Sequence, residues 1–261
     1  MHHFFVKPEQ IEGRLVRITG PDVNHGRQVL RLKEGENLLI SDGAGRDYVC
    51  VVKALEKDCI TAAILREDEE NRELPAAITL YQGLPKQDKM ELIIQKAVEL
   101  GAARIVPVAT EYAVVKLDGR REEAKLKRWQ AIAESGAKQS KRSRIPQVGE
   151  VMSFKDALLE GGKAGLRLFA YEHEEGMAGT KRELAKVRSG QEIALFVGPE
   201  GGFSQAEVKM AGEAGFAPIS LGKRILRTET AGLALLSVLM LKLEMCSEGC
   251  TDGGEDGSIF R

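Results

Sequence analysis

Two short apolar runs, each leading into an unusual loop, constrain the fold of this 261-residue chain most strongly. The runs at 193–197 and 217–221 have the length and composition of buried strands. The first is followed by Gly198-Pro199-Glu200-Gly201-Gly202, and the second by the charged loop Gly222–Glu229. Ligands of open α/β sheets lie beyond the carboxyl ends of the strands. We therefore expect the two loops to form one pocket.

The first loop, taken alone, also fits a tight turn before a helix. Ser204 and Glu207 have the spacing of a capping box, which predicts that a helix begins there. Neither loop has a phosphate-binding pattern, because the glycines miss the G-x-G-x-x-G spacing and no G-x-x-x-x-G-K-[ST] surrounds Gly222. A nucleotide-phosphate site is therefore disfavoured.

The rest of the chain predicts two folded regions. Residues 1–66 contain five short apolar runs separated by turns, which is typical of a small β-barrel. From residue 77 onward strands alternate with helices, which predicts an α/β domain with a largely parallel sheet. The acidic stretch 67–76 resembles a linker. We expect domains at 1–70 and 76–244 and a disordered tail at 245–261.

Composition restricts the partners that the chain can have. The net charge of −1 gives no overall attraction to nucleic acid, so any RNA must be held by local basic patches. The four cysteines form no C-x-x-C pair, and no histidine lies near enough to suggest a metal site. No apolar stretch is long enough to span a bilayer. We expect a cytoplasmic protein that binds neither metal nor membrane.

Two sets of basic residues are candidates for RNA contact. Each set also fits a solvated surface, because charged side chains face water in any case. The first set lies in the N-terminal region and the second in the run K-Q-S-K-R-S-R. The residues are Arg17, Arg27, Arg31 and Lys33, and then Lys138, Lys141, Arg142 and Arg144.

The two loops together, V-G-P-E-G-G-F-S-x-x-E and L-G-x-R-I-L-R-T-E-T-A, resemble the RsmE family of 16S rRNA (uracil-N3)-methyltransferases, in the SPOUT superfamily. The similarity extends to H-F-F-V at the start, to V-L-R-L-K at 29–33 and to D-K-M-E-L-I-I-Q-K-A-V-E-L-G at 88–101. It covers nearly everything except about the last fifteen residues.

The resemblance implies a PUA-like RNA-binding β-barrel followed by a SPOUT methyltransferase domain with a C-terminal trefoil knot. It also implies that the knot holds S-adenosylmethionine, that a homodimer completes the pocket, and that the substrate is a uridine of 16S rRNA, within the small ribosomal subunit. The final helix, expected over 229–244, is apolar nearly all round, which suits burial in the core or against a second subunit.

The chemistry of this substrate and cofactor suggests roles for the residues of the two loops. Arg227 is expected to stabilise the uracil anion, and Glu200 or Glu229 to accept the N3 proton. Both glutamates also fit a helix-entry charge, and Thr228 also fits a helix cap. The expected cofactor-binding residues are Gly198, Pro199, Glu200, Gly201, Leu221, Gly222, Ile225, Leu226, Thr228 and Thr230.

Two other functions stay open at this point. A non-catalytic RNA-binding protein would use the barrel and the basic run, but it leaves the paired loops without a purpose. A SPOUT enzyme that acts on tRNA or on another base would keep the same loops, because base choice depends on pocket shape.

Overall fold

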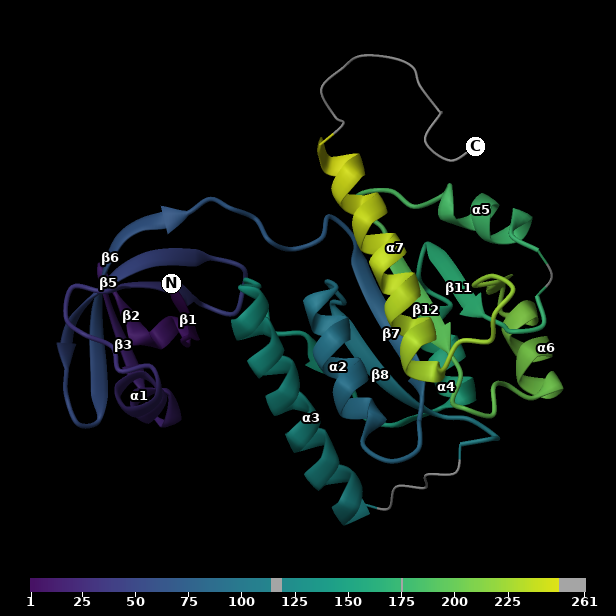
Figure 1. Cartoon of the computed structure of the whole chain (residues 1–261), viewed down its shortest axis with the longest axis horizontal. Helices are drawn as coiled ribbons and strands as arrows, with labels where there is room; N and C mark the ends of the chain where they lie inside the picture. Colours follow the sequence, from purple (N-terminus) through teal and green to yellow (C-terminus); the bar gives the residue numbers. More distant parts are fainter. Residues whose placement is uncertain (114–118, 175, 249–261) are drawn as a thin grey trace. The chain divides into compact units, whose positions relative to one another are not determined.

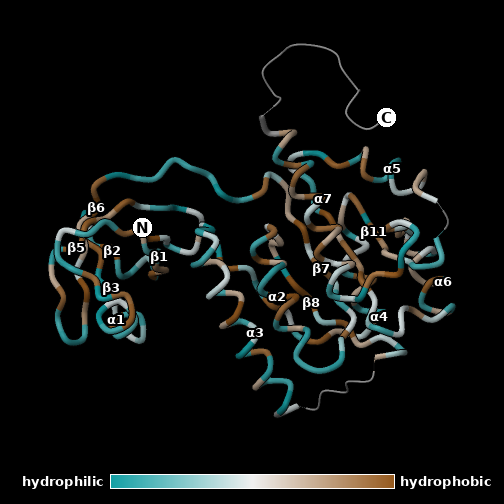
Figure 2. The backbone as a smooth tube through the Cα atoms, viewed as in Figure 1, coloured by the Kyte–Doolittle hydropathy of each residue, from teal (hydrophilic) through white to brown (hydrophobic). Residues whose placement is uncertain are grey.

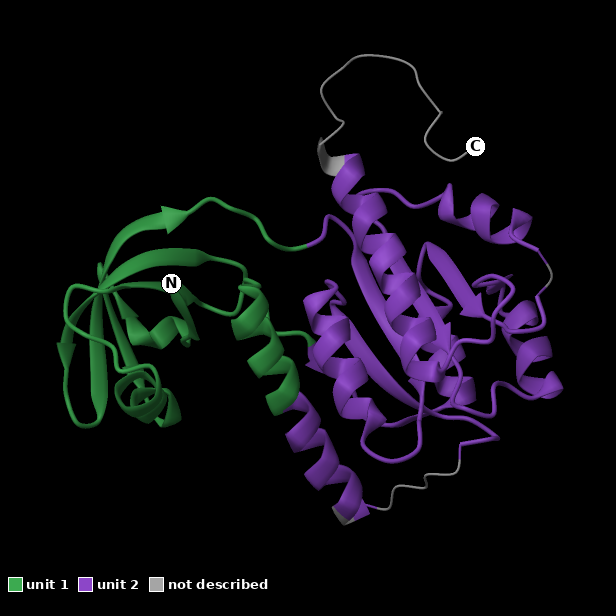
Figure 3. Ribbon diagram, viewed as in Figure 1, with its two compact units in different colours: residues 1–73, 131–146 green, residues 74–130, 147–261 purple. Residues whose placement is uncertain are grey.

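The structure, a computed structural model, describes residues 1–113, 119–174 and 176–248. The chain divides into two compact units (Figure 3). Unit 1 contains Met1–Glu73 and Ala131–Pro146, and unit 2 contains Leu74–Gln130 and the described residues from Gln147 onward. The stretch 131–146 thus lies in unit 1, although it falls inside the second domain expected from the sequence.

Unit 1 is built on a six-stranded sheet in the order β1-β4-β5-β6-β3-β2. Its neighbouring strands are antiparallel except for β1 and β4, which are parallel. The sheet surrounds one apolar core that includes Phe4, Ile18, Leu38 and Ile60. The strands are β1 His2–Phe5, β2 Ile11–Glu12, β3 Leu15–Thr19, β4 Asn37–Ser41, β5 Asp47–Leu55 and β6 Cys59–Asp68. All five strands expected here are confirmed, and the two-residue β2 is additional.

Short helical segments complete unit 1. They are η1 Pro8–Gln10, α1 Pro21–Asn24 and the π-helical turn η2 His25–Val29. The sequence predicts a short helix over 24–32. The observed helix α1 begins three residues earlier, because Pro21 occupies the first turn, where its missing N–H costs nothing. It also ends earlier, and Arg31 has a positive φ of 53°.

Unit 2 contains a parallel sheet in the order β10-β8-β7-β12-β11-β13, with β9 paired to β8 (Figure 1). Its central strands are almost fully buried, and Figure 2 shows hydrophobic residues along β7 and β8. The strands are β7 Ala77–Gly83, β8 Arg104–Ala109, β9 Gln147–Val148, β10 Met152–Ser153, β11 Leu166–Ala170, β12 Glu192–Val197 and β13 Ala217–Ile219. The predicted parallel α/β sheet is confirmed.

Helices cover both faces of this sheet. Helices α2 and α7 pack side by side across the near face in Figure 1. On the other face, Phe154 of α4 and Ala211 of α6 join a core with Tyr81 and Phe196 of the sheet. The helices are α2 Lys89–Glu99, α3 Gly119–Ser140, α4 Phe154–Gly161, α5 Ala178–Leu184, α6 Gln205–Glu213 and α7 Thr228–Glu248. Helix α3 runs across the division between the units at residue 130.

Helix ends agree with the sequence in most places. The capping box of Ser204 and Glu207 is present at the start of α6, and the Ser153 side chain caps α4. The spacing of Thr180 and Glu183 also predicts a capping box at the start of a helix. This prediction is wrong, because α5 begins at Ala178 and the Thr180 hydroxyl donates to the Ser220 carbonyl oxygen.

The C-terminal helix is longer than expected. α7 continues to Glu248, because no glycine or proline interrupts the sequence between Gly232 and position 249. Residues 245–248 of the expected tail are therefore helical, and the remainder of that tail lies outside the described residues. None of the described helices is long and apolar enough to cross a membrane.

Candidate functional site

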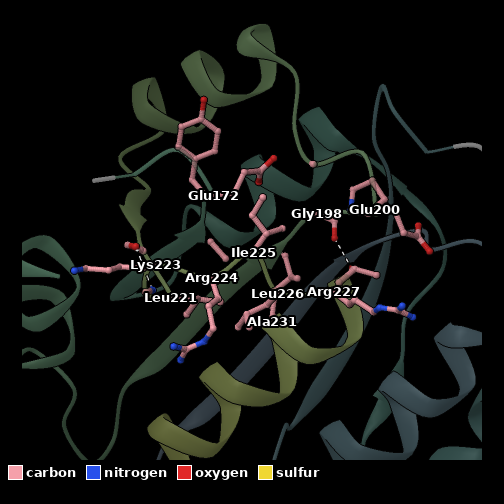
Figure 4. A pocket seen from close by; sticks show the side chains of 18 of the residues that line it. Glu172, Gly198, Glu200, Leu221, Lys223, Arg224, Ile225, Leu226, Arg227 and Ala231 are labelled. Atoms are coloured by element: carbon pink, nitrogen blue, oxygen red, sulfur yellow. Dashed lines mark hydrogen bonds between the residues drawn. The ribbon is translucent and has the colours of Figure 1, made fainter. Parts of the chain in front are cut away.

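A cavity of about 440 Å³ lies beyond the carboxyl ends of β11, β12 and β13 (Figure 4). Both loops singled out in the sequence contribute to it, as does the segment that follows β11. Its lining consists of Lys89, Ala170, Tyr171, Glu172, Val197, Gly198, Pro199, Glu200, Gly202, Ser220, Leu221, Gly222, Lys223, Arg224, Ile225, Leu226, Arg227, Thr228 and Ala231. The expected joint pocket is therefore present.

The first loop is compact because its glycines allow backbone atoms to approach closely. The Gly202 N–H donates to the Pro199 carbonyl oxygen at 3.0 Å, and Gly202 has a positive φ of 67°. A Cβ atom at Gly83, the last residue of β7, would lie 2.5 Å from Pro199 Cδ. A side chain at either glycine would thus displace the loop or strain its backbone.

Thr228 joins the two loops. Its hydroxyl donates to the Gly198 carbonyl oxygen at 2.5 Å and accepts from Gln82 Nε2 at 2.9 Å. Thr228 is buried at the start of α7, and Gln82 is buried near the end of β7. The hydroxyl therefore fixes the first loop to the start of the last helix.

Two of the expected cofactor-binding residues lie away from the cavity lining. A Cβ at Gly201 would face Tyr112, at 2.9 Å from its Cβ, and Thr230 is exposed on α7. The other eight expected residues all line the cavity. Whether any of the ten contacts a cofactor stays a prediction.

Lys89 brings together the two glutamates expected to act as bases. Its Nζ lies 2.9 Å from Glu200 Oε1 and 3.4 Å from Glu229 Oε2. The hydrogen bond to Glu200, supported by that to Glu229, raises the pKa of Lys89. Lys89 and Glu200 line the cavity, whereas Glu229 is not among its lining residues. The sequence alone favours a surface position for Lys89, and the structure places it partly exposed, at 25%, in the cavity lining.

The Glu200 carboxylate is stabilised in its charged form. Both of its oxygens also accept from the Lys86 backbone N–H, each at 3.2 Å. Burial opposes ionisation, but the hydrogen bonds from Lys89 and from backbone N–H groups prevail and lower the pKa of Glu200. A lowered pKa makes this carboxylate a weaker proton acceptor.

Three exposed cations lie on the second loop. They are Lys223, Arg224 and Arg227, and each lines the cavity. Within the described part of the chain, none of the three has an ion-pair partner. Ile225, between them, is 89% exposed. The loop therefore presents positive charge and one apolar side chain to solvent beside the cavity (Figure 4).

The basic run at 138–144 differs, because acids hold two of its members. Lys138 Nζ lies 3.0 Å from Asp22 Oδ1 and 2.8 Å from Glu134 Oε1. Arg142 is buried, and its Nη2 lies 2.5 Å from Glu73 Oε2. Lys141 and Arg144 are exposed. Only these last two present their charges openly to a ligand.

The N-terminal basic residues lie mostly on the surface of unit 1. Arg17, Arg31 and Lys33 are exposed, and Arg27 is half-buried, with its Nη1 donating to the Lys57 carbonyl oxygen at 3.2 Å. RNA contact by these residues stays a prediction.

The structure adds lining residues that the sequence analysis did not select. They come from the segment after β11 and from the start of α2, and they include Tyr171, Glu172 and Lys89. The acidic sequence Glu172-His173-Glu174 directly follows an expected strand, so its place at a strand end was the available signal. The described residues contain no group of three or more His, Cys, Asp or Glu side chains that could hold a metal ion.

Comparison with known proteins identifies the class. A family model described as an RNA methyltransferase domain matches residues 72–240, and one described as an RNA methyltransferase PUA domain matches residues 18–65. The chain therefore belongs to this family of RNA methyltransferases.

Individual relatives cover almost the whole chain. It is 36% identical over 251 residues to the ribosomal RNA small subunit methyltransferase E of Bacillus subtilis, a match that covers 94% of this chain and 98% of that protein. The protein of the same name from Mycobacterium bovis is 32% identical over 95% of both chains. A crystal structure of the Neisseria gonorrhoeae enzyme bound to S-adenosyl methionine is 35% identical, with a TM-score of 0.81 over 92% of this chain and 97% of that one. The resemblance to the RsmE family, with a PUA domain before an α/β methyltransferase domain, is confirmed.

Proposed function

We propose that this protein transfers the methyl group of S-adenosylmethionine to the uracil N3 of one uridine in 16S rRNA. The main support for the proposal is that both loops line one cavity, and that a hydrogen bond from Thr228 to Gly198 joins them. Membership of the RNA methyltransferase family and similarity to small-subunit enzymes support the substrate class.

The residues around the cavity fit the methyl donor. Its volume falls within the range of small-molecule sites, roughly 300–1,000 Å³. Leu221 and Leu226 offer apolar walls, while Gly198 and Gly202 let the first loop pack closely, because a Cβ at either position would meet neighbouring atoms within about 3.2 Å. When bound, S-adenosylmethionine supplies a methyl group already activated on a sulfonium. The protein must then mainly hold and align the reacting atoms.

Methylation at uracil N3 requires access to the pairing edge of the base and removal of the N3 proton. N3 lies on the Watson–Crick edge, so the base must be unpaired or flipped toward the pocket. It also carries a proton, and the anion left by its loss needs a cation nearby. We assign that role to Arg227, whose guanidinium is exposed beside the cavity.

The proton acceptor is assigned to Glu200 or Glu229. Lys89 lies beside both carboxylates. The lowered pKa of Glu200 makes it a weaker proton acceptor, and Glu229 is not among the lining residues, so both carboxylates stay candidates.

RNA binding is proposed to use the exposed cations rather than the paired ones. Lys223 and Arg224 beside the cavity, and Lys141 and Arg144 in unit 1, are free to approach phosphates. Arg17, Arg31 and Lys33 are further candidates. Each cation that contacts a phosphate adds to the salt dependence of binding.

A homodimer is proposed to cover the outer face of α7. Val238, Leu241 and Met245 of this helix are exposed apolar residues, as is Leu92 of the adjacent α2. An apolar face of this kind favours association with a second copy. We further propose that the loops belong to a trefoil knot, that the protein acts in the cytoplasm, and that its substrate is 16S rRNA within the small ribosomal subunit.

Methylation with labelled donor tests the proposal. Purified protein is incubated with small ribosomal subunits, free 16S rRNA or tRNA, and the RNA is analysed by mass spectrometry and reverse transcription. An N3-methyl group blocks the pairing edge, so the expected result is label on one uridine of 16S rRNA and a reverse-transcription stop there.

Other outcomes separate the alternatives. Label on tRNA, or on a different atom, would indicate a related enzyme of other specificity. A protein that binds rRNA but shows neither methyl transfer nor thermal stabilisation by S-adenosylmethionine would be a non-catalytic binder. The proposed enzyme should gain about 2.7 kcal/mol of stability at a donor concentration one hundred times Kd.

A further inference from the structure

A third strand end lies between the two loops of the pocket. The sheet order places β11 between β12, which leads into the first loop, and β13, which leads into the second. Ala170, the last residue of β11, pairs with Ile219 of β13, and the Tyr171 N–H donates to the Ile219 carbonyl oxygen at 3.1 Å. The next residue, Glu172, therefore leaves the sheet between the two loops and lines the cavity.

The Glu172 side chain lies against the first loop. A Cβ atom at Gly202 would clash with the Glu172 carboxylate, at 3.1 Å from its Cδ and 3.2 Å from Oε2. Gly202 is thus the position where the loop leaves space for this carboxylate. Figure 4 shows the side chain directed from the end of β11 toward the loop that carries Gly198. One side of the carboxylate thus lies against Gly202, while the residue as a whole is exposed.

Glu172 differs from the other carboxylate of the cavity. Glu200 is paired with Lys89, whereas Glu172 has no hydrogen-bond or ion-pair partner within the described residues. An ionised carboxylate only accepts hydrogen bonds, and its two oxygens can receive two donors side by side. The pocket therefore contains one free acceptor pair suited to a ligand that carries two neighbouring donors.

The apolar residues of the pocket indicate which part of a ligand would meet Glu172. In Figure 4, Ile225 lies close to Glu172, and Leu226 follows it. An aromatic base would suit these apolar residues. The ribose adjoins the base in a nucleoside-based methyl donor, and its vicinal hydroxyls are two neighbouring donors for the Glu172 carboxylate.

We propose that Glu172 binds the 2′- and 3′-hydroxyls of the ribose of the methyl donor and so selects a ribonucleoside. This inference rests on the proposed function, because it takes the cavity as the donor site. It assigns to Glu172 a binding role, with no part in proton transfer.

The test measures ligand affinity by calorimetry, without turnover. The ligands are S-adenosylmethionine, 5′-methylthioadenosine, which lacks the amino-acid part, and 2′-deoxy-5′-methylthioadenosine. The wild-type protein is expected to bind the deoxy compound about tenfold more weakly than its ribose parent, because a hydrogen bond to a charged group is lost. Glu172→Gln is expected to bind both S-adenosylmethionine and 5′-methylthioadenosine about tenfold more weakly, and to distinguish much less between the ribose and deoxy compounds.

A matched control and two contrary outcomes make the test decisive. Glu174→Gln, two residues away and outside the cavity lining, should bind all three ligands as the wild type does. If Glu172→Gln weakened only S-adenosylmethionine, the carboxylate would meet the amino-acid ammonium and the ribose assignment would be wrong. If it weakened none, Glu172 would be a solvated carboxylate. Failure of the wild type itself to bind any of the three would instead contradict the proposed function.

Discussion

Two groups of basic residues in this protein differ sharply in how their charges are used. In the run at 138–144, Arg142 is buried against Glu73, and Lys138 lies between Asp22 and Glu134. In the loop after β13, Lys223, Arg224 and Arg227 are all exposed, with no ion-pair partner among the described residues. The segment with more basic residues thus has fewer available charges.

This comparison shows that a cluster of basic residues in the sequence does not by itself identify an RNA-binding surface. Two of the acids that pair with Arg142 and Lys138 are distant in sequence, at positions 73 and 22, and the third, Glu134, is four residues from Lys138. Buried ion pairs hold an element in place, whereas exposed cations are available to phosphates. We therefore expect substitution of the paired residues in the run at 138–144 to lower stability. Substitution of the exposed cations in the loop after β13 should instead lower RNA affinity or turnover.

The largest effect is expected for Arg227→Ala. Removal of the cation beside the uracil anion should lower single-turnover methylation by about 10²–10³-fold, the range seen when one stabilising donor is lost. Calorimetric binding of S-adenosylmethionine should change little. Lys209→Ala, which removes an exposed cation of α6 outside the cavity lining, serves as the control. An unchanged methylation rate for Arg227→Ala would reject its assigned role.

The next effect concerns the folded state of unit 1. Arg142→Ala leaves the Glu73 carboxylate without its buried partner and should lower the free energy of unfolding by about 3 kcal/mol. Lys141→Ala should change it by less than about 0.5 kcal/mol. Urea denaturation measures both. Equal effects of the two substitutions would show that burial of Arg142 does not distinguish it from its exposed neighbour.

The pH dependence of stability tests whether His3, which contacts Lys138 of the same run, is buried in its neutral form. His3 Nδ1 lies 3.3 Å from the Lys138 carbonyl oxygen, and His3 Nε2 lies 2.7 Å from Ser41 Oγ. Ser41 contacts Asp47, which also accepts a hydrogen bond from Ser143 at 2.5 Å. Burial lowers the pKa of His3 from 6.5 to about 4, although Asp47 opposes this shift.

The sign of the effect follows from the two pKa values. Between pH 6.5 and about 4 the unfolded chain binds a proton at His3 that the folded chain does not. The free energy of unfolding should therefore fall as the pH decreases through this window, by up to about 3 kcal/mol from this group. His3→Gln should remove that part of the slope, and substitution of the exposed His25 should not. Identical slopes for all three proteins would contradict the assignment.

The smallest effect is expected for RNA affinity. Each exposed cation that contacts a phosphate contributes about 0.7–0.9 to the slope of log K against log salt. The pair Lys223→Ala and Arg224→Ala should lower that slope by about 1–2, and so should the pair Lys141→Ala and Arg144→Ala if unit 1 also binds RNA. A slope unchanged in the first pair would remove the second loop from the RNA surface. A slope unchanged in the second would leave unit 1 without a role for its exposed run.

Much of the site could be predicted from the sequence because its main parts are local. A strand followed by Gly198–Gly202, and another followed by Gly222–Glu229, are contiguous signals, and the parallel arrangement of the strands brings the loops to one edge of the sheet. The rest depends on which strands are neighbours. The sequence does not reveal that β11 lies between β12 and β13, so the position of Glu172 could not be assigned.

Ion pairs between residues distant in sequence account for other features of the structure that the sequence did not predict. Lys89 is an ordinary helix-entry lysine in the sequence, and only the fold brings Glu200 and Glu229 to it. The same holds for the burial of Arg142 by Glu73. The trefoil knot, the homodimer and the RNA contacts of both units stay predictions.

A crystal structure of the protein with bound S-adenosylmethionine would show whether the two loops form the donor site. We expect the adenosine to lie between the loop after β12 and the loop after β13, with the methyl group near Arg227. Density for the donor anywhere outside the cavity between these loops would contradict it.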